Sequence, residues 1–179
     1  MVTLETERLL IRDNIKEDLF KHHLLMSDPE VMYYIQDIQC YSLEDSQENL
    51  EFSLEESKKG KERTCYFFAI IEKKSKSYVG SIGFTVTEKN SKGGIGALGY
   101  FILKDYWHKG YTTEAVRKVI EVAFDEVGLH KITTGCIYEN TYSEKIMIKC
   151  GFKKEAHFTK HVFHQGQWKD RVEYGLIKP

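Results

Sequence analysis

The segment that decides the fold reads Asp105-Tyr106-Trp107-His108-Lys109-Gly110-Tyr111-Thr112-Thr113-Glu114. Residues 95–103, before it, are rich in aromatic and β-branched side chains, and residues 115–127, after it, repeat apolar side chains at helical spacing. The segment is therefore a turn between a strand and a helix. Such a turn presents backbone N–H groups beside the positive end of a helix dipole, an arrangement that binds phosphate.

The residue types of this turn suit an anionic ligand. Gly110 lets the backbone approach a pyrophosphate closely, and Lys109 adds a positive charge. Thr112 and Thr113 offer hydroxyl groups for hydrogen bonds. The turn lacks both the lysine-serine/threonine pair of a P-loop and the three glycines of a dinucleotide fingerprint. The sequence therefore predicts a phosphate site of a different kind.

The pattern of the whole chain predicts one mixed α/β (α+β) domain over residues 1–179. The expected elements are a strand over residues 4–13, helices over 14–27 and 42–60, strands over 64–72, 77–88 and 95–103, a helix over 115–127, a strand over 131–138, a helix over 140–150, and a hairpin of 152–164 and 167–177. Ser42, with Asp45 three residues later, marks the start of the second helix. We expect a single, mostly antiparallel sheet flanked by helices.

Composition excludes several classes of protein. The 26 basic and 27 acidic residues leave a net charge of −1, whereas a nucleic-acid-binding domain usually has a basic excess. No stretch approaches the roughly 20 apolar residues of a membrane span, and residues 1–12 lack the apolar core of a signal peptide. The 4 cysteines lie far apart, which predicts free thiols. We expect a cytoplasmic protein without a nucleic-acid or membrane partner.

Histidines do not suggest a metal centre. His157 and His161 share a face of one expected strand, but two such ligands are too few and too far apart for a metal site. We therefore expect no metal cofactor.

Several motifs, in their order and spacing, resemble the GNAT acetyltransferase superfamily, in particular its ribosomal-protein N-terminal acetyltransferases of the RimJ/RimL type. They are Glu5-Thr6-Glu7-Arg8-Leu9-Leu10-Ile11-Arg12, Gly99-Tyr100-Phe101-Ile102, the run from Trp107 to Glu114, which is similar to W-G-K-G-Y-A-T-E, Asn140-Thr141-Tyr142-Ser143, Cys150-Gly151-Phe152, and Gly166-Gln167-Trp168-Lys169-Asp170. The resemblance covers nearly the whole chain. It implies the acyl-CoA N-acyltransferase (GNAT) fold and acetyl-CoA as co-substrate.

The resemblance places the acetyl-CoA loop of the superfamily on residues 107–112. It also implies that main-chain atoms of residues 101–103 bind pantetheine. The cofactor-binding residues expected from the turn and the resemblance together are Phe101, Ile102, Leu103, His108, Lys109, Gly110, Tyr111, Thr112, Thr113, Asn140 and Ser143. His108 replaces a small residue of the family pattern and Thr112 replaces Ala or Gly, so this loop is bulkier. His108 either contacts a phosphate or points outward.

The resemblance also suggests how catalysis proceeds. Ser143 matches the serine proposed as the general acid for the leaving thiolate in similar enzymes, although a polar residue in the first turn of a helix can also be structural. Met147 stands where many members have a tyrosine, and Val162 where some have a carboxylate. Glu114 and His161 stay open as bases, and we assign none.

The sequence thus predicts an acetyl-CoA-dependent N-acetyltransferase whose acceptor is a primary amine that attacks directly in a ternary complex. One acceptor is a protein N-terminal α-amine of the ribosomal-protein type. The alternatives are a polyamine, an aminoglycoside or an amino acid, or a non-catalytic acyl-CoA-binding module. Tyr33 and Tyr34 fall where the family builds its acceptor wall, with core packing as the alternative. Trp168 and Tyr174 predict core or dimer contacts, so a homodimer is one expected assembly.

Overall fold

The computed structural model describes the backbone of residues 1–179 and every side chain except that of Gln36. The strands are β1 (Thr3–Glu5), β2 (Leu9–Asp13), β3 (Cys65–Glu72), β4 (Tyr78–Asn90), β5 (Gly93–Ile102), β6 (Lys131–Ile137), β7 (Lys153–His164) and β8 (Gln167–Ile177). The α-helices are α1 (Leu19–Ser27), α2 (Leu43–Lys58), α3 (Tyr111–Asp125) and α4 (Thr141–Lys149). Within the described residues the strands form one mixed sheet in the order β1-β2-β3-β4-β5-β6-β8-β7, as expected.

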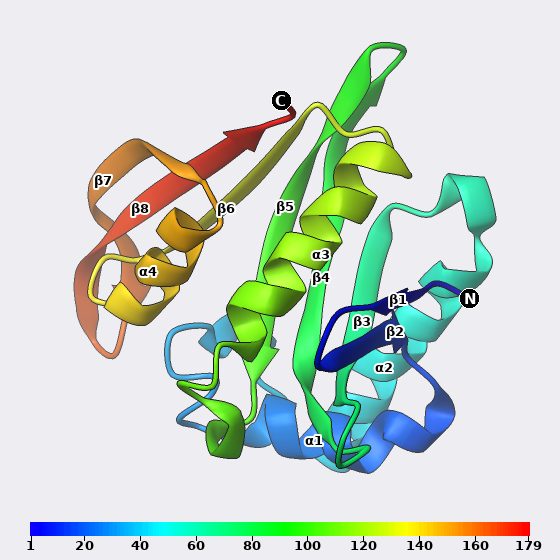
Figure 1. Ribbon diagram of the computed structural model, residues 1–179. Helices are drawn as coiled ribbons and strands as arrows, with labels where there is room; N and C mark the ends of the chain where they lie inside the picture. The colour runs from blue at the N-terminus through cyan, green and yellow to red at the C-terminus, as the bar shows by residue number, and fades with distance from the viewer. The chain divides into compact units, whose positions relative to one another are not determined.

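The chain divides into two compact units, and each unit combines two segments of the chain (Figure 1). Unit 1 comprises residues 1–85 and 99–119, and unit 2 comprises residues 86–98 and 120–179. The expected domain over residues 1–179 stays a prediction. The turn between β5 and α3, residues 103–110, is predicted to bind phosphate and is called the phosphate turn below. It lies within unit 1.

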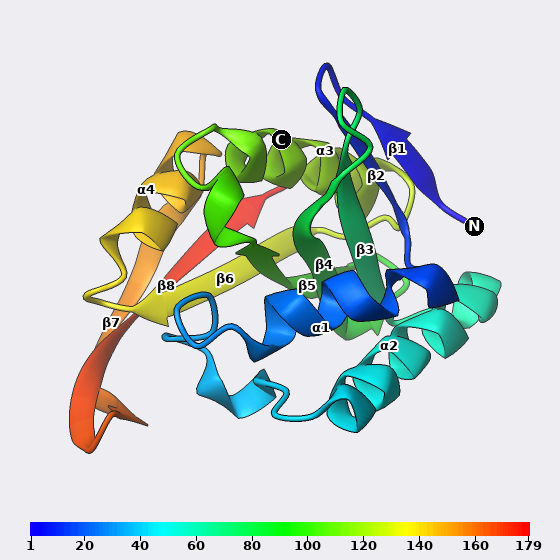
Figure 2. The same ribbon diagram turned by 90° about the horizontal axis from the view of Figure 1, so that it is seen from below.

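In unit 1, helices cover both faces of the sheet: α1 and α2 lie on one face of β2–β4, and the first half of α3 lies on the other (Figure 2). Ser42 caps α2 as predicted, because its Oγ accepts the Asp45 N–H at 3.0 Å and Asp45 Oδ2 accepts the Ser42 N–H at 2.9 Å. One apolar cluster contains Leu25 and Tyr78, and Phe101 at the end of β5 packs against it. Burial of these side chains fixes the end of β5 against α1.

The expected strand over residues 4–13 is wrong, because residues 6–8 form a turn between β1 and β2. The two short strands pair antiparallel, with Leu4 opposite Ile11. The Thr6 N–H donates to the Leu9 C=O at 2.9 Å, and Thr6 Oγ1 accepts the Leu9 N–H at 2.9 Å. The Thr6 hydroxyl therefore competes with an extended strand for these backbone groups, and Arg8 lies in the resulting turn.

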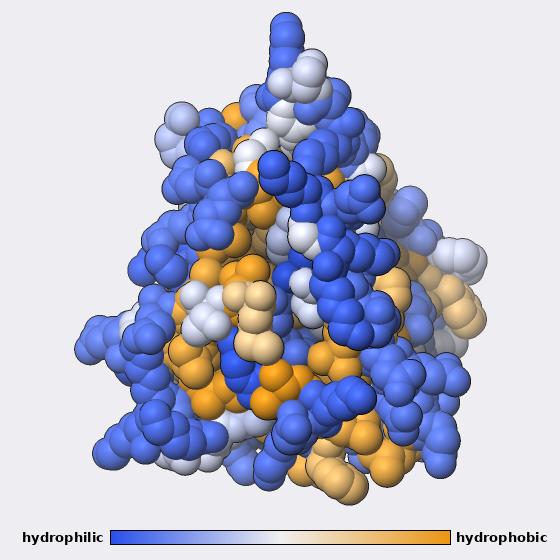
Figure 3. Space-filling model, turned by 90° about the vertical axis from the view of Figure 1, so that its right-hand side faces the viewer, coloured by the Kyte–Doolittle hydropathy of each residue, from blue (hydrophilic) through white to orange (hydrophobic). Residues whose placement is uncertain are grey.

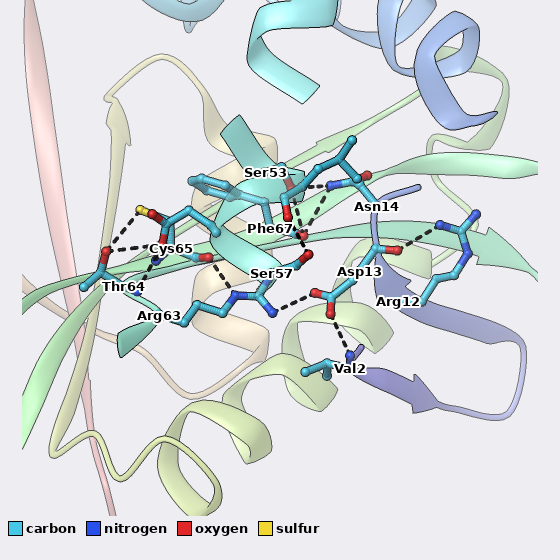
Figure 4. Close-up of polar contacts among 12 residues, drawn as sticks. Val2, Arg12, Asp13, Asn14, Ser53, Ser57, Arg63, Thr64, Cys65 and Phe67 are labelled. Carbon is cyan, nitrogen blue, oxygen red and sulfur yellow. Dashed lines mark hydrogen bonds and ion pairs between the residues drawn. The ribbon is translucent and has the colours of Figure 1, made fainter. Parts of the chain in front are cut away.

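A buried polar network anchors β2 (Figure 4). Arg63 Nη1 lies 2.8 Å from Asp13 Oδ1, and the two side chains are only 3% and 1% exposed. Asn14 Nδ2 donates to Ser53 Oγ of α2 at 2.8 Å. Removal of one partner from a buried ion pair costs roughly 3–5 kcal/mol, so this network makes the position of β2 hard to change.

The surface of unit 1 includes apolar side chains on its helices. Phe20 and Leu24 of α1 and Phe52 of α2 are exposed. Figure 3 shows the side of the molecule on which α2 lies, where apolar side chains appear between hydrophilic ones. Such exposed apolar side chains are common on protein surfaces. Among the described residues, no helix is both long enough and apolar enough to cross a bilayer.

Unit 2 contains the predicted hairpin. β7 and β8 pair antiparallel, and β8 also pairs antiparallel with β6. Gln165 and Gly166 form the turn with φ of +49° and +75°. β5 pairs with β6 in parallel over Ile95–Ala97 and Lys131–Thr133, and β5 continues to Ile102 in unit 1. α4 follows β6 and buries Met147.

Candidate active site

The predicted phosphate turn leads directly into α3. His108 and Gly110 have left-handed backbone conformations, with φ of +59° and +80°. The Glu114 N–H donates to the Gly110 C=O at 3.2 Å. The amides of Tyr111 and Thr112 precede this bond and therefore have no acceptor inside the helix. The dipole and these amides together attract an anion to this end of α3.

The left-handed backbone explains why the family pattern has a small residue at position 108. Glycine adopts a positive φ without steric cost, and histidine is among the few other residues that are enriched there. The His108 side chain is exposed. Its two expected roles, a phosphate contact or an outward orientation, both stay predictions.

The other side chains of the turn have local partners. Lys109 Nζ lies 5.0 Å from the ring centroid of Tyr106. Tyr111 is buried, and its hydroxyl donates to the carboxylate of Glu72. This hydrogen bond raises the pKa of Tyr111. Tyr111 therefore offers its amide, rather than its ring, to a ligand at the turn.

The sequence analysis missed Arg8, which contacts the phosphate turn from the β1–β2 connection. Arg8 Nη1 donates to the Lys109 C=O at 2.8 Å, and Arg8 Nε donates to Glu114 Oε2 at 2.7 Å. The guanidinium carbon lies 4.6 Å from the ring centroid of Tyr111. The opening motif contained Arg8, but no local pattern predicts a partner 106 residues away along the chain.

Glu114, one of the two candidate bases, is an engaged carboxylate. Thr6 Oγ1 donates to Glu114 Oε1 at 2.5 Å, and the Arg8 N–H donates to the same oxygen at 2.9 Å. Burial raises the pKa of Glu114, but the hydrogen bonds from Thr6 and Arg8 outweigh burial and leave the pKa below its usual range. A carboxylate held in its charged form by these partners is a weak proton acceptor.

The end of β5 presents backbone groups of two kinds. The Leu103 N–H donates to the Val79 C=O of β4 at 2.9 Å, and Trp107 Nε1 donates to the Ile102 C=O at 2.7 Å. Successive backbone amides of a strand point to opposite edges. Because the Leu103 amide points to β4, the Ile102 amide points away from β4. Of the three residues expected at pantetheine, Ile102 therefore has the amide best oriented for a ligand.

Tyr33 and Tyr34 lie in the segment between α1 and α2. Tyr33 is 44% exposed and Tyr34 is half-buried, and their rings meet edge to face with centroids 4.9 Å apart. Met32 belongs to a buried cluster against which Phe101 and Val31 pack. Met32, the neighbour of Tyr33 in the chain, therefore packs near the end of β5, and the acceptor role of Tyr33 and Tyr34 stays a prediction.

Asn140 and Ser143 lie in unit 2, at the start of α4. Asn140 is the N-cap, and its Oδ1 accepts the Ser143 N–H at 3.2 Å. Burial raises the pKa of the Cys136 thiol to about 11, the charge of Glu144 adds to this effect, and a hydrogen bond with the Ser143 side chain opposes it. Asn140 therefore stabilises the start of α4, and the expected site roles of Asn140 and Ser143 stay predictions.

Four other residues singled out by the sequence lie in unit 2. Met147 is buried, and the ring of His161 lies 4.8 Å from that of Phe158. Tyr174 is buried, and its hydroxyl donates to Glu144 Oε1 at 2.5 Å. Trp168 is exposed and contacts Phe163 edge to face. Tyr174 is thus a core residue of unit 2, and the expected homodimer stays a prediction.

Comparison with known proteins identifies the family. Residues 8–153 match the acetyltransferase (GNAT) domain family. The uncharacterized N-acetyltransferase YoaA of Bacillus subtilis is 27% identical over 98% of this chain and 97% of its own length. The crystal structure of ribosomal-protein-S5-alanine acetyltransferase from Vibrio fischeri has a TM-score of 0.83 at 21% identity, with 100% of both chains covered.

A further solved structure shares the fold. Spermidine N-acetyltransferase from Vibrio cholerae, in complex with CoA and spermine, has a TM-score of 0.83 at 18% identity and covers 96% of each chain. The family match covers most of the chain and includes the predicted phosphate turn. The chain belongs to the GNAT acetyltransferase family and is an N-acetyltransferase.

Proposed function

We propose that this N-acetyltransferase transfers the acetyl group of acetyl-CoA to the α-amine of a protein N-terminus. The co-substrate is held first through its pyrophosphate, at the turn that ends at Gly110. The amides of Tyr111 and Thr112 and the positive end of α3 bind the phosphate oxygens, and Lys109 adds charge. Gly110 adopts its left-handed φ of +80° without the steric cost that a Cβ would bring.

The pantetheine arm runs along the end of β5 in this proposal. The Ile102 N–H binds the thioester carbonyl and stabilises the oxyanion that develops on it. Phe101 and Leu103 shape the adjacent surface, and Tyr33 and Tyr34 form part of the acceptor wall. Asn140 and Ser143, which the resemblance assigns to the co-substrate, belong to unit 2, and their roles stay predictions.

The reaction needs a neutral amine and a leaving thiolate. The amine nitrogen attacks the thioester carbon, the C–N bond forms, and collapse of the tetrahedral intermediate breaks the C–S bond. The nitrogen loses a proton to water, and the thiolate gains one from Ser143 or from water. A thiol of pKa about 8.5 leaves readily, so an acid contributes modestly.

One observation carries the choice of an α-amine: the carboxylate of Glu114 is already engaged by Thr6 and Arg8. A lysine or polyamine amine has a pKa near 10.4 and needs a base, whereas an α-amine of pKa about 7.7–8.0 is partly neutral at pH 7.5. The Vibrio fischeri structure is named for a ribosomal-protein alanine acceptor, and the Vibrio cholerae structure for spermidine. The names of these two structures therefore include both classes of acceptor.

A matched pair of peptides tests the acceptor. One peptide has a free α-amine and no lysine, and the other has an acetylated N-terminus and differs in sequence only by one residue replaced with lysine. We expect CoA release, detected as free thiol, only with the first peptide, and we expect kcat/KM to rise with pH up to about pH 8.

Turnover with spermidine or with the lysine peptide, without turnover of the α-amine peptide, would refute the α-amine proposal. CoA binding without turnover on any amine, including amino acids and aminoglycosides, would favour the non-catalytic acyl-CoA-binding alternative. Calorimetric titration of the same protein with CoA shows whether CoA binds when no amine is acetylated.

A further inference from the structure

The turn between β1 and β2 brings Arg8 onto the phosphate turn of unit 1. We propose that Arg8 is a positioning residue for the co-substrate, which orients the peptide bond before Gly110 and neutralises Glu114 in the first turn of α3. This inference rests on the proposed binding of the acetyl-CoA pyrophosphate at the same turn.

The first part of the proposal concerns peptide orientation. Arg8 Nη1 holds the Lys109 C=O at 2.8 Å. In a trans peptide the C=O of one residue and the N–H of the next point in opposite directions. Arg8 therefore directs the Gly110 N–H away from itself. Arg8 Nη2 would lie 3.4 Å from a Cβ at Gly110, so the guanidinium group packs directly against the turn.

The second part concerns charge. Glu114 lies in the first turn of α3, where its negative charge would repel a pyrophosphate at the same helix end. Arg8 lies against this carboxylate, with Nε and Nη2 at 2.7 and 2.6 Å from Oε2. Two guanidinium nitrogens therefore contact one carboxylate oxygen, whereas the single ammonium nitrogen of a lysine would supply one contact. Arg8 thus offsets the negative charge of the acidic residue in the first turn of α3.

The position of Arg8 is itself fixed by three elements. Its C=O accepts the Lys73 N–H at 2.9 Å, in the turn between β3 and β4. The β1–β2 and β3–β4 turns lie side by side (Figures 1 and 2). The guanidinium group lies over the ring of Tyr111, whose hydroxyl is held by Glu72. Arg8 therefore approaches the phosphate turn in a preorganised orientation.

If Arg8 had a purely structural role, its removal would lower the stability of the fold and the affinity for every ligand together. If Arg8 is a positioning residue, its removal lowers the affinity only for ligands that carry the pyrophosphate. The experiment compares acetyl-CoA with S-acetylpantetheine, which lacks the nucleotide, using wild type, Arg8→Lys, Arg8→Ala, and Arg8→Ala combined with Glu114→Gln. Arg12→Ala is the matched control, because Arg12 lies on β2 and forms a bidentate pair with Asp18 at 2.7 and 2.8 Å.

We expect Arg8→Ala to raise the Kd for CoA and the KM for acetyl-CoA by about tenfold, which corresponds to about 1.4 kcal/mol. The value of kcat at saturation and the kcat/KM for S-acetylpantetheine should change by less than about twofold, because those steps do not use the pyrophosphate. Arg8→Lys should fall between wild type and Arg8→Ala. Arg12→Ala should lower Tm without a change in the Kd for CoA.

The double variant gives the sharpest result. Removal of the carboxylate charge in Arg8→Ala with Glu114→Gln should recover about threefold in CoA affinity over Arg8→Ala alone, although the protein loses stability further. Equal CoA affinity of wild type and Arg8→Ala would overturn the proposal, and so would equal losses for acetyl-CoA and S-acetylpantetheine. Absence of CoA binding by wild type would instead refute the proposed function, and the role of Arg8 with it.

Discussion

Substitution of Gly110 tests the phosphate turn most directly, because two variants separate backbone strain from charge. Gly110 has φ of +80°, and a Cβ there would meet only Arg8 Nη2, at 3.4 Å. Gly110→Ala therefore suffers mainly the left-handed backbone cost, roughly 1–2 kcal/mol. In a protein of this size each kcal/mol lowers Tm by about 2–4 °C. We expect Gly110→Ala to melt about 2–8 °C below wild type.

Gly110→Glu adds a negative charge where the pyrophosphate is proposed to bind. Two unit charges about 4 Å apart repel each other by about 1 kcal/mol in water and about 4 kcal/mol near a protein surface. We therefore expect CoA to bind Gly110→Glu about 30-fold more weakly than Gly110→Ala, or about 2 kcal/mol. Calorimetric titration with CoA, at low and high salt, measures this difference, which added salt should reduce.

Gly166→Ala is the matched control for both variants. Gly166 has φ of +75° at the tip of the β7–β8 hairpin, with nothing within 4 Å of a Cβ. Gly166→Ala should lower Tm by an amount similar to that of Gly110→Ala and should bind CoA with the wild-type affinity. The reasoning fails if Gly110→Ala keeps the wild-type Tm, or if Gly110→Glu and Gly110→Ala bind CoA equally.

Two further predictions concern unit 2 and the acid side of stability. Ser143→Ala should slow acetyl transfer, measured in the pre-steady state, by about 10²-fold with little change in acetyl-CoA affinity. Its control, Asn140→Ala, should instead lose about 1 kcal/mol of stability, because the helix cap is removed. A full-rate chemical step in Ser143→Ala would remove Ser143 from the catalytic residues. A hydrogen bond from Lys59 and the backbone amides of Cys65 and Thr64 lower the pKa of Glu56 to about 2, so its stabilising contribution is complete above its ordinary pKa of 4.5 and disappears as pH falls towards 2. Urea unfolding should therefore show wild type about 1.5–3 kcal/mol more stable than Glu56→Gln at pH 6, with the gap closing by pH 2.5; a constant gap would contradict this.

Local sequence patterns were sufficient to predict the elements that depend on local physics. The strand, turn and helix around Gly110 follow from a change of apolar period and from a glycine at a left-handed position. The start of α2 at Ser42 follows from a side chain three residues from its partner. The closing hairpin follows from two strand-like runs joined by Gln165 and Gly166. In each case the deciding contacts join residues close together in the chain.

The first strand shows where this reasoning ends. Residues 4–13 have the composition of one strand, yet the Thr6 hydroxyl closes a turn with Leu9 and divides the strand in two. Side-chain hydrogen bonds of this kind compete with the sheet by small energy differences that composition does not reveal. The turn places Arg8 where a continuous strand would not.

The family motifs and the phosphate turn were thus determined by the sequence itself, because their signals are local. Only the tertiary structure decided that Arg8 and Glu114, 106 residues apart, share one ion pair at the turn, and that Asp13 is buried against Arg63. It also decided that the Glu114 carboxylate is engaged and that the Ser143 side chain contacts Cys136. These roles depend on which distant surfaces the hydrophobic core brings together, and no local pattern of residues carries that information.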